Sequence, residues 1–396
     1  MLLSIIPFFW ALLQLFIGYN LVFPLIVLVI YLFVKKPLKI AALGKEADYA
    51  IIVTAYENTA LLPIVVASLL QLKYNNYLVY IVADKCDISD LHFDSDKILL
   101  LRPESILASN TRSHFYAINR FKRQHERLTI IDSDNLVDEN YLLELNKYFD
   151  AGFSAVQGER KAKNLNTNYA CLDAARDVYY HFYDGQVLFG AGSSATLAGS
   201  GMAFTVRLYT DCLAKLDITG AGFDKVLQKE IVSRKYRIAF TKDAIVYDEK
   251  TAGSDQLVKQ RARWINTWFK YVKFGFVLLA KGITNVNWNQ MLFGFVLLRP
   301  PLFIFLLLSV ACMAINIIIN PIVALYWFIG LGLFVFGFVL ALAVSNTDKR
   351  IYQSLWNIPK FMFFQVLSLL KVRKANEVSV ATQHAFQASI EDIKNK

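Results

Sequence analysis

Cysteine and histidine are scarce in this chain of 396 residues, which holds four cysteines and five histidines. No two cysteines form a CxxC pair, and the histidines show no HExxH motif or other paired spacing. This pattern argues against a disulfide framework and a zinc site, and it suits a reducing compartment. We expect any bound metal to be held by oxygen ligands.

Charge is missing altogether from residues 3–34, which are almost wholly apolar. A membrane-spanning helix needs about 20 apolar residues, so this block predicts one long span or a span with an interfacial lead-in. A secretory signal peptide is the alternative, but no basic segment precedes the block and no small-residue cleavage site ends it. Lys35, Lys36 and Lys39 follow instead, and we expect a membrane anchor.

A second uncharged block, residues 302–344, is divided by Asn320-Pro321 into two apolar stretches. Each is long enough to cross a membrane, so the block predicts a transmembrane hairpin. Lys349 and Arg350 follow it, and the positive-inside rule places the basic ends of both blocks in the cytosol. We therefore expect a multi-pass integral protein of the inner or plasma membrane, with the middle of the chain in the cytosol.

The net charge of +10 is compatible with nucleic acid or anionic lipid as a partner. Lys35, Lys36 and Lys39 directly follow the first apolar block, and Lys349 and Arg350 directly follow the second, which favours lipid and phosphate. The basic run at residues 120–127 has a helical amphipathic pattern, so we interpret it as a solvated helix face. We expect no nucleic-acid partner.

Short β-branched runs, each followed by a turn signal and a helical pattern, lie between the apolar blocks at residues 50–54, 78–82, 97–101 and 128–131. This order predicts an α/β fold with a mostly parallel sheet and helices on both faces. Ligands of such sheets bind at the carboxyl ends of the strands.

The strongest local motif follows the fourth of these runs and reads Asp132-Ser133-Asp134. Two carboxylates at i and i+2 on a turn can converge on one hard cation, which can bridge to a diphosphate and neutralise its charge. A turn whose aspartate caps the next helix is the alternative.

Two other predicted strands end in side chains that suit a nucleotide. Asp84 follows the second run, where it could accept hydrogen bonds from a ribose or a base, although a plain strand-to-turn aspartate is as good an interpretation. Ala55 and Tyr56 end the first strand, and Tyr56 could pack on a base.

Two motifs further along the chain add an acid and a basic aromatic cluster. Asp224 follows the turn Gly220-Ala-Gly222, where it could act as a general base toward an acceptor hydroxyl or cap a helix. Gln260, Arg263 and Trp264 share one helix face. They offer an amide, a guanidinium suited to phosphate and an indole suited to stacking on a sugar. Anchoring at the membrane interface is the alternative for this cluster.

In chain order, the strand-end aspartate, the DxD, the aspartate after glycines and the QxxRW motif resemble the family-2 inverting glycosyltransferases with a GT-A fold. That group contains the cellulose, chitin and hyaluronan synthases and their non-processive relatives. The resemblance covers about residues 48–280 and includes residues 155–158, 199–204 and 246–249. One departure is Phe223, which stands where many members have an acid directly before the base.

The resemblance implies a Rossmann-like mixed sheet and an enzyme that transfers a hexosyl or N-acetylhexosaminyl group from a nucleotide-sugar, expected to be a UDP-sugar. Asp132 and Asp134 would hold Mg²⁺ or Mn²⁺ against the donor diphosphate. Ser133 would lie beside the two aspartates, and Arg263 would lie near the diphosphate. Asp224 would take the proton from the acceptor hydroxyl.

The remaining roles implied by the resemblance concern the nucleoside and the acceptor. Asp84 would contact the nucleoside, near Ala55 and Tyr56. The acceptor would be a lipid-linked or glycan molecule. Its binding site would be lined by Gly199, Ser200, Gly201, Gln260 and Trp264.

The expected organisation has five parts: an anchor (1–36), a cytosolic GT-A domain (48–260), QxxRW-linked interfacial helices (261–300), a transmembrane hairpin (301–345), and an interfacial helix with a cytosolic tail (346–396). We expect simple transfer of one sugar. One alternative is a processive synthase that exports its polymer, for which three spans look too few without oligomerisation. The other is a non-catalytic membrane subunit of a glycan-assembly complex.

Overall fold

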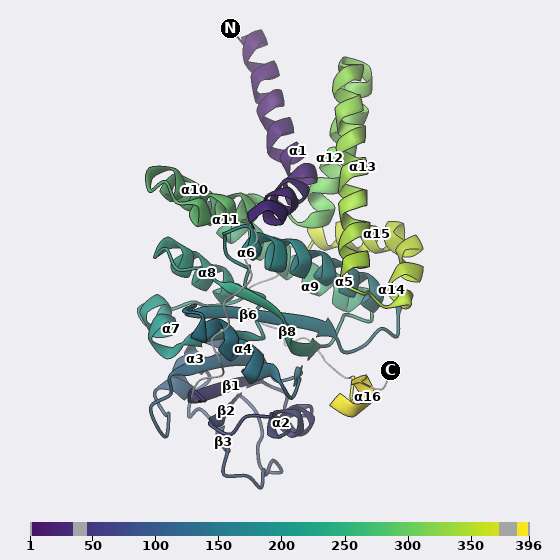
Figure 1. Ribbon diagram of the computed structural model, residues 1–396. Helices are drawn as coiled ribbons and strands as arrows, with labels where there is room; N and C mark the ends of the chain where they lie inside the picture. The colour runs from purple at the N-terminus through teal and green to yellow at the C-terminus, as the bar shows by residue number, and fades with distance from the viewer. Residues whose placement is uncertain (1, 35–45, 372–385, 395–396) are drawn as a thin grey trace.

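Three long apolar helices project from one side of an α/β domain in the computed structural model, which describes residues 2–34, 46–371 and 386–394 (Figure 1). Shorter helices lie between the long helices and the sheet, and the N-terminus lies at the far end of the first long helix (Figure 1). Lys35, Lys36 and Lys39, on which the predicted orientation partly depends, fall outside the described residues.

Strands in the described residues form one eight-stranded sheet in the order β3-β2-β1-β4-β7-β6-β8-β5. Their bounds are β1 Tyr49–Tyr56, β2 Tyr77–Asp84, β3 Ile98–Leu101, β4 Arg127–Asp132, β5 Leu136–Val137, β6 Ala155–Ala162, β7 Met202–Thr205 and β8 Ala239–Asp248. The four strands predicted from β-branched runs are confirmed as β1 to β4.

The prediction of a mostly parallel sheet is confirmed, because six of the eight strands in the described residues run in the same direction. Strands β3, β2, β1 and β4 pair in parallel, and so do β6 and β8. Two strands are reversed: β7 runs antiparallel to both β4 and β6, and β5 runs antiparallel to β8. The sheet is therefore mixed. An apolar run carries no signal of its pairing direction, which depends on where the chain returns to the sheet.

Helices cover both faces of the sheet, as predicted. Alternate residues of the buried central strand β1 point to opposite faces: Ile51 and Val53 belong to one core cluster, and Ala50 and Ile52 to the other. The first cluster is covered by α2 (Leu62–Leu70) and α4 (Tyr141–Asp150), and the second by α3 (Asn110–Ile118), α7 (Val206–Leu213) and α8 (Phe223–Ser233).

The second core cluster continues from the sheet toward the long helices. Between them lies a helical segment made of α5 (Asn168–Tyr180), the π-helix η1 (His181–Val187) and α6 (Leu188–Gly190). Tyr183 of η1 belongs to the same cluster as Leu21 and Trp327 of the long helices, and its hydroxyl donates to the Gly337 carbonyl at 2.9 Å. The α/β domain and the long helices thus share one core.

The predicted membrane spans are present as helices long and apolar enough to cross a membrane: α1 (Leu2–Val34), α12 (Leu302–Ile319) and α13 (Pro321–Val344). Asn320 separates the last two because its side chain accepts the N–H of Val323 and caps α13, while Pro321 takes the first helical position. Gln14 of α1 accepts hydrogen bonds from Asn316 and Trp327 and so joins all three helices.

Shorter helices lie between the sheet and the spans (Figure 1): α9 (Ser254–Tyr271), α10 (Lys273–Thr284), α11 (Trp288–Leu298), α14 (Lys349–Ser354), the 3₁₀ turn η2 (Leu355–Asn357) and α15 (Ile358–Leu369). They include the two segments predicted to be interfacial, and their position at the membrane surface stays a prediction. The proposed boundary at residues 260/261 falls inside α9, a continuous helix.

The described end of the tail, with α16 (Ile390–Lys394), returns to the domain, where Lys394 pairs with Asp138 at 2.9 Å.

The basic run at residues 120–127 is not the predicted helix face. Helix α3 ends at Ile118, and the chain then forms an irregular turn before β4. The buried His125 ring holds this turn, since it contacts the Tyr80 hydroxyl at 2.8 Å and the Asp48 carboxylate at 2.5 Å. These long-range hydrogen bonds override the local helical pattern.

A buried ion pair joins the α/β domain to the membrane helices. Asp184 of η1 pairs with Arg299, which lies between α11 and α12, and both side chains are under 10% exposed. The Arg299 guanidinium also lies 5.2 Å from the centre of the Tyr180 ring.

Arg299→Ala should leave Asp184 as an uncompensated buried charge and lower the free energy of unfolding by about 3–5 kcal/mol. Thermal unfolding of the detergent-solubilised protein measures this loss. Arg350→Ala is the matched control, since it removes an exposed pair with Asp348 and should cost less than about 1 kcal/mol. Equal losses in the two variants would contradict the proposed importance of the buried pair.

Candidate active site

A cavity of about 700 Å³ lies where the carboxyl ends of β1 and β4 meet η1, α8 and α9. This volume is within the usual range for small-molecule sites, about 300–1,000 Å³. Most of the predicted site residues line it: Tyr56, Asp132, Ser133, Asp134, Gly199, Asp224, Gln260, Arg263 and Trp264. The structure therefore brings the DxD, the third aspartate and the QxxRW motif together.

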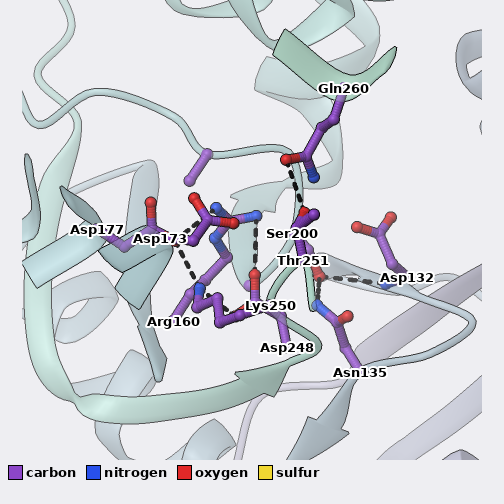
Figure 2. A network of polar contacts seen from close by, with 12 residues as sticks. Asp132, Asn135, Arg160, Asp173, Asp177, Ser200, Asp248, Lys250, Thr251 and Gln260 are labelled. Atoms are coloured by element: carbon purple, nitrogen blue, oxygen red, sulfur yellow. Dashed lines mark hydrogen bonds and ion pairs between the residues drawn. The ribbon is translucent and has the colours of Figure 1, made fainter. Parts of the chain in front are cut away.

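The DxD turn is held rigidly at the end of β4. The buried Ser200 hydroxyl accepts the backbone N–H of Asp132 at 3.1 Å and the amide N–H of Asn135 at 2.9 Å (Figure 2). On the other side, the Lys163 ammonium donates to the Asp134 carbonyl at 3.1 Å. These bonds fix the backbone, so that both carboxylates are presented to the cavity.

The DxD turn can hold a divalent metal only together with oxygen atoms from a bound diphosphate and from water. In the part of the chain that the structure describes, no three His, Cys, Asp or Glu side chains are grouped so that they could hold a metal ion. Asp132 and Asp134 supply carboxylate oxygens, which Mg²⁺ and Mn²⁺ prefer, and diphosphate and water oxygens would complete the coordination.

Asp224 reaches the cavity because α8 begins in close contact with α9. Gly222 caps α8 with a φ of 99°, and no side chain caps the helix, so Asp224 does not have the capping role. A Cβ on Gly222 would lie 2.6 Å from the Tyr271 ring and 2.7 Å from Thr267. The Lys225 ammonium lies 3.1 Å from the Asp224 carboxylate.

The QxxRW motif faces the cavity from α9. The Gln260 amide oxygen accepts a hydrogen bond from the Thr251 hydroxyl at 3.0 Å (Figure 2). The Trp264 ring lies 4.1 Å from each of the guanidiniums of Arg176 and Arg261, measured to the ring centre. Burial lowers the pKa of Arg263. Membrane anchoring, the alternative for this motif, does not account for its place in the cavity.

A buried ion network forms one wall of the cavity (Figure 2). The Lys250 ammonium lies 2.5 Å from both Asp177 of α5 and Asp248 of β8. Arg160 of β6 lies 3.5 Å from the same two carboxylates. Burial alone would raise the pKa of Asp177, but the charges of Arg176, Lys250 and Arg160 outweigh it and hold the pKa well below the usual value.

This network positions the tryptophan of the motif. Asp173 lies one turn before Asp177 on α5. It pairs with Arg261 and lies 3.1 Å from Arg176. These two arginines are the ones that contact Trp264. Burial, together with the neighbouring Arg176 charge, lowers the pKa of Arg261 to about 10. Sequence reasoning missed these residues, although an Asp-x-x-Arg-Asp pattern in an otherwise apolar helix is a signal of buried charge.

The family model described as "Glycosyltransferase like family 2" matches residues 47–267, more than half of the chain. The chain belongs to this family. It is therefore a glycosyltransferase, as the motifs predict. A search of curated proteins finds no significant match.

Similarity to solved structures extends over most of the glycosyltransferase. The mannosyltransferase PcManGT from Pyrobaculum calidifontis, in complex with GDP-Man and Mn²⁺, superposes with a TM-score of 0.53 at 15% identity and covers 90% of this chain and 98% of that one. TarS 1-349 of S. aureus has a TM-score of 0.41 at 13% identity, with 83% and 90% covered. The PcManGT match confirms the predicted GT-A fold.

Four predicted site residues of the glycosyltransferase do not line the cavity: Ala55, Asp84, Ser200 and Gly201. The Asp84 carboxylate is buried and accepts the backbone N–H groups of Leu107 and Ala108 at 3.0 and 2.8 Å. It holds that loop beside the sheet, as Ser200 holds the DxD turn. Their contacts with nucleoside or acceptor stay predictions.

His181 is a cavity residue that the motifs did not indicate. It begins the π-helix η1, a rare element that is frequent at functional sites. Burial lowers its pKa to about 4, so the imidazole is neutral at pH 7 and faces the cavity as an uncharged polar group.

Gly222→Ala should lower kcat by about 100-fold, because the new Cβ must displace Tyr271 or Thr267 and thereby shift Asp224 by about 1 Å. Initial rates of sugar transfer measure the effect. Gly152→Ala is the matched control: its φ is also positive, at 93°, but a Cβ there meets nothing within 4 Å. A kcat near the wild-type value in Gly222→Ala would show that the α8–α9 contact does not position the aspartate.

Proposed function

We propose that this glycosyltransferase transfers a sugar from a nucleotide-diphospho-sugar to a lipid-linked or glycan acceptor, with inversion at the anomeric carbon, at the cytosolic face of a membrane. The observation that carries the proposal is the shared cavity, in which Asp132, Asp134 and Asp224 meet the QxxRW helix. These groups come from three separate segments, yet they lie around one space of substrate size.

The donor diphosphate is placed at the DxD turn in this proposal. Asp132 and Asp134 would hold Mg²⁺ or Mn²⁺, which offsets the negative charge of the diphosphate leaving group. Arg263 lines the same cavity and supplies a further positive charge for the departing diphosphate. The Tyr56 ring, at the end of β1, provides a surface for the base.

Asp224 is the general base of the proposed displacement. Its side chain is 16% exposed, and it lines the cavity from the first turn of α8. It takes the proton of the acceptor hydroxyl as the oxygen attacks the anomeric carbon, and the bond to the diphosphate breaks. A single displacement of this kind inverts the anomeric configuration.

The placement of the helices supports the proposed orientation. The three candidate spans leave the α/β domain on the same side, and the N-terminus lies at the far end of α1 (Figure 1). Lys349 and Arg350 begin α14, beside the domain. By the positive-inside rule, these basic residues favour a cytosolic domain.

Asp134→Ala and Asp224→Asn should each lower transfer by at least about 1,000-fold while the protein stays folded, since they remove the metal-binding and proton-accepting groups. Labelled-sugar transfer and thermal unfolding measure the two properties. Asp211→Asn, an exposed carboxylate on α7, is the control and should transfer at the wild-type rate. Transfer near the wild-type rate by either site variant would remove that residue from the mechanism.

Nucleotide-sugars should raise the thermal stability of the protein only together with Mg²⁺ or Mn²⁺, because ligand binding to the folded state is linked to stability. We expect a UDP-sugar to give the largest shift, and GDP-mannose belongs in the same screen because the similar mannosyltransferase structure holds it. Asp134→Ala should lose the shift. A shift of equal size without metal would contradict the role of the DxD.

A further inference from the structure

The cavity has a second, apolar end away from the DxD turn. Its wall there is made of hydrocarbon side chains from the end of α9, from α10, from the end of α11 and from the first turn of α12: Val272, Phe274, Val296, Leu297, Pro300, Pro301, Leu302 and Phe303. A single cavity therefore runs from the carboxylates to a largely apolar wall, in which Arg299 is neutralised by its buried pair with Asp184.

This apolar end lies where the chain enters the membrane region. Leu302 is the first residue of α12, a helix long and apolar enough to cross a membrane. On the adjoining α10–α11 hairpin, Phe276, Ile283 and Val286 are 56%, 66% and 91% exposed. Apolar side chains so exposed next to a membrane span face the bilayer rather than water.

Two buried N–H donors lie along the same cavity without a hydrogen-bond partner among the described residues. They are Gln228 Nε2, one turn after Asp224 on α8, and Trp268 Nε1, one turn after Trp264 on α9. The Gln228 amide orientation is fixed because its oxygen accepts the Leu197 N–H at 3.0 Å. Oxygen atoms of a bound head group would satisfy such donors.

We propose that the acceptor is a membrane lipid with a hydroxyl or phosphate head group, which reaches Asp224 from the bilayer along this apolar end. The inference rests on the proposed function and selects the lipid from the two acceptor classes. A free glycan would gain nothing from a hydrocarbon wall, whereas a lipid buries its first methylenes there.

The reaction balances for both head groups. The acceptor oxygen forms a bond to the anomeric carbon as the bond to the donor diphosphate breaks, and the nucleoside diphosphate leaves. A hydroxyl head group passes its proton to Asp224, and a phosphate head group that enters as the monoanion passes its remaining P–OH proton to the same carboxylate.

The test uses the full-length protein in phosphatidylcholine vesicles with a radiolabelled donor and Mn²⁺. One set of vesicles contains diacylglycerol, another contains a polyprenyl phosphate, and a third contains neither but is given soluble oligosaccharides. Label extracted into organic solvent from the first or second set supports the proposal and identifies the head group. Label found only on the soluble oligosaccharides overturns it.

A matched pair of variants tests the apolar wall. Phe274 and Phe276 both lie on α10, but only Phe274 lines the cavity. Phe274→Asn should raise the KM for the lipid acceptor about tenfold, as expected for a lost apolar contact, whereas Phe276→Asn should change it less than twofold. An unchanged KM in Phe274→Asn would overturn the entry path.

Failure of the inference and failure of the proposed function give different results. Metal-dependent release of nucleoside diphosphate without label in any lipid would leave the proposed function standing and overturn the lipid acceptor. No release of nucleoside diphosphate from any donor would overturn both.

Discussion

The buried ion network of α5 is the interaction on which the cavity depends. Asp173 and Asp177 bring together arginines and a lysine from β6, α5, α9 and the segment after β8. Charges this deeply buried are stable only when paired, so the four segments cannot separate without a large cost in free energy. The network thereby fixes the helix that carries the QxxRW motif against the strands that end in the DxD.

Buried polar contacts also join the α/β domain to the long apolar helices. Asp184 follows Asp177 along the same helical segment and pairs with Arg299, directly before the span α12. Tyr183 donates to a backbone carbonyl of α13. A domain attached only by flexible linkers would have no fixed position relative to the bilayer. Here, buried polar contacts hold the cavity at a constant place relative to the three candidate spans, as the proposed lipid acceptor would require.

The prediction from sequence succeeded where the signal is local and failed where it is not. The three spans, the four parallel strands and the DxD at the end of β4 follow from apolar length, periodicity and strand-end chemistry, and each is confirmed as an element. The antiparallel β7 and the irregular turn around His125 were missed, because both are decided by contacts with residues far away in the chain. Asp84 and Ser200 accept hydrogen bonds from backbone N–H groups, which the sequence did not indicate, and their predicted contacts with ligands stay predictions.

The sequence by itself determined the family, the membrane helices and the types of chemical group available, since these are carried by motifs and by runs of apolar residues. The resemblance carried by the motifs assigned Asp134, Asp224 and Trp264 to one site, but only the tertiary structure shows that they line one cavity, because long stretches of chain separate them. The tertiary structure also decided that this cavity ends in a hydrocarbon wall beside α12, since the wall is assembled from four segments that meet only in the folded protein.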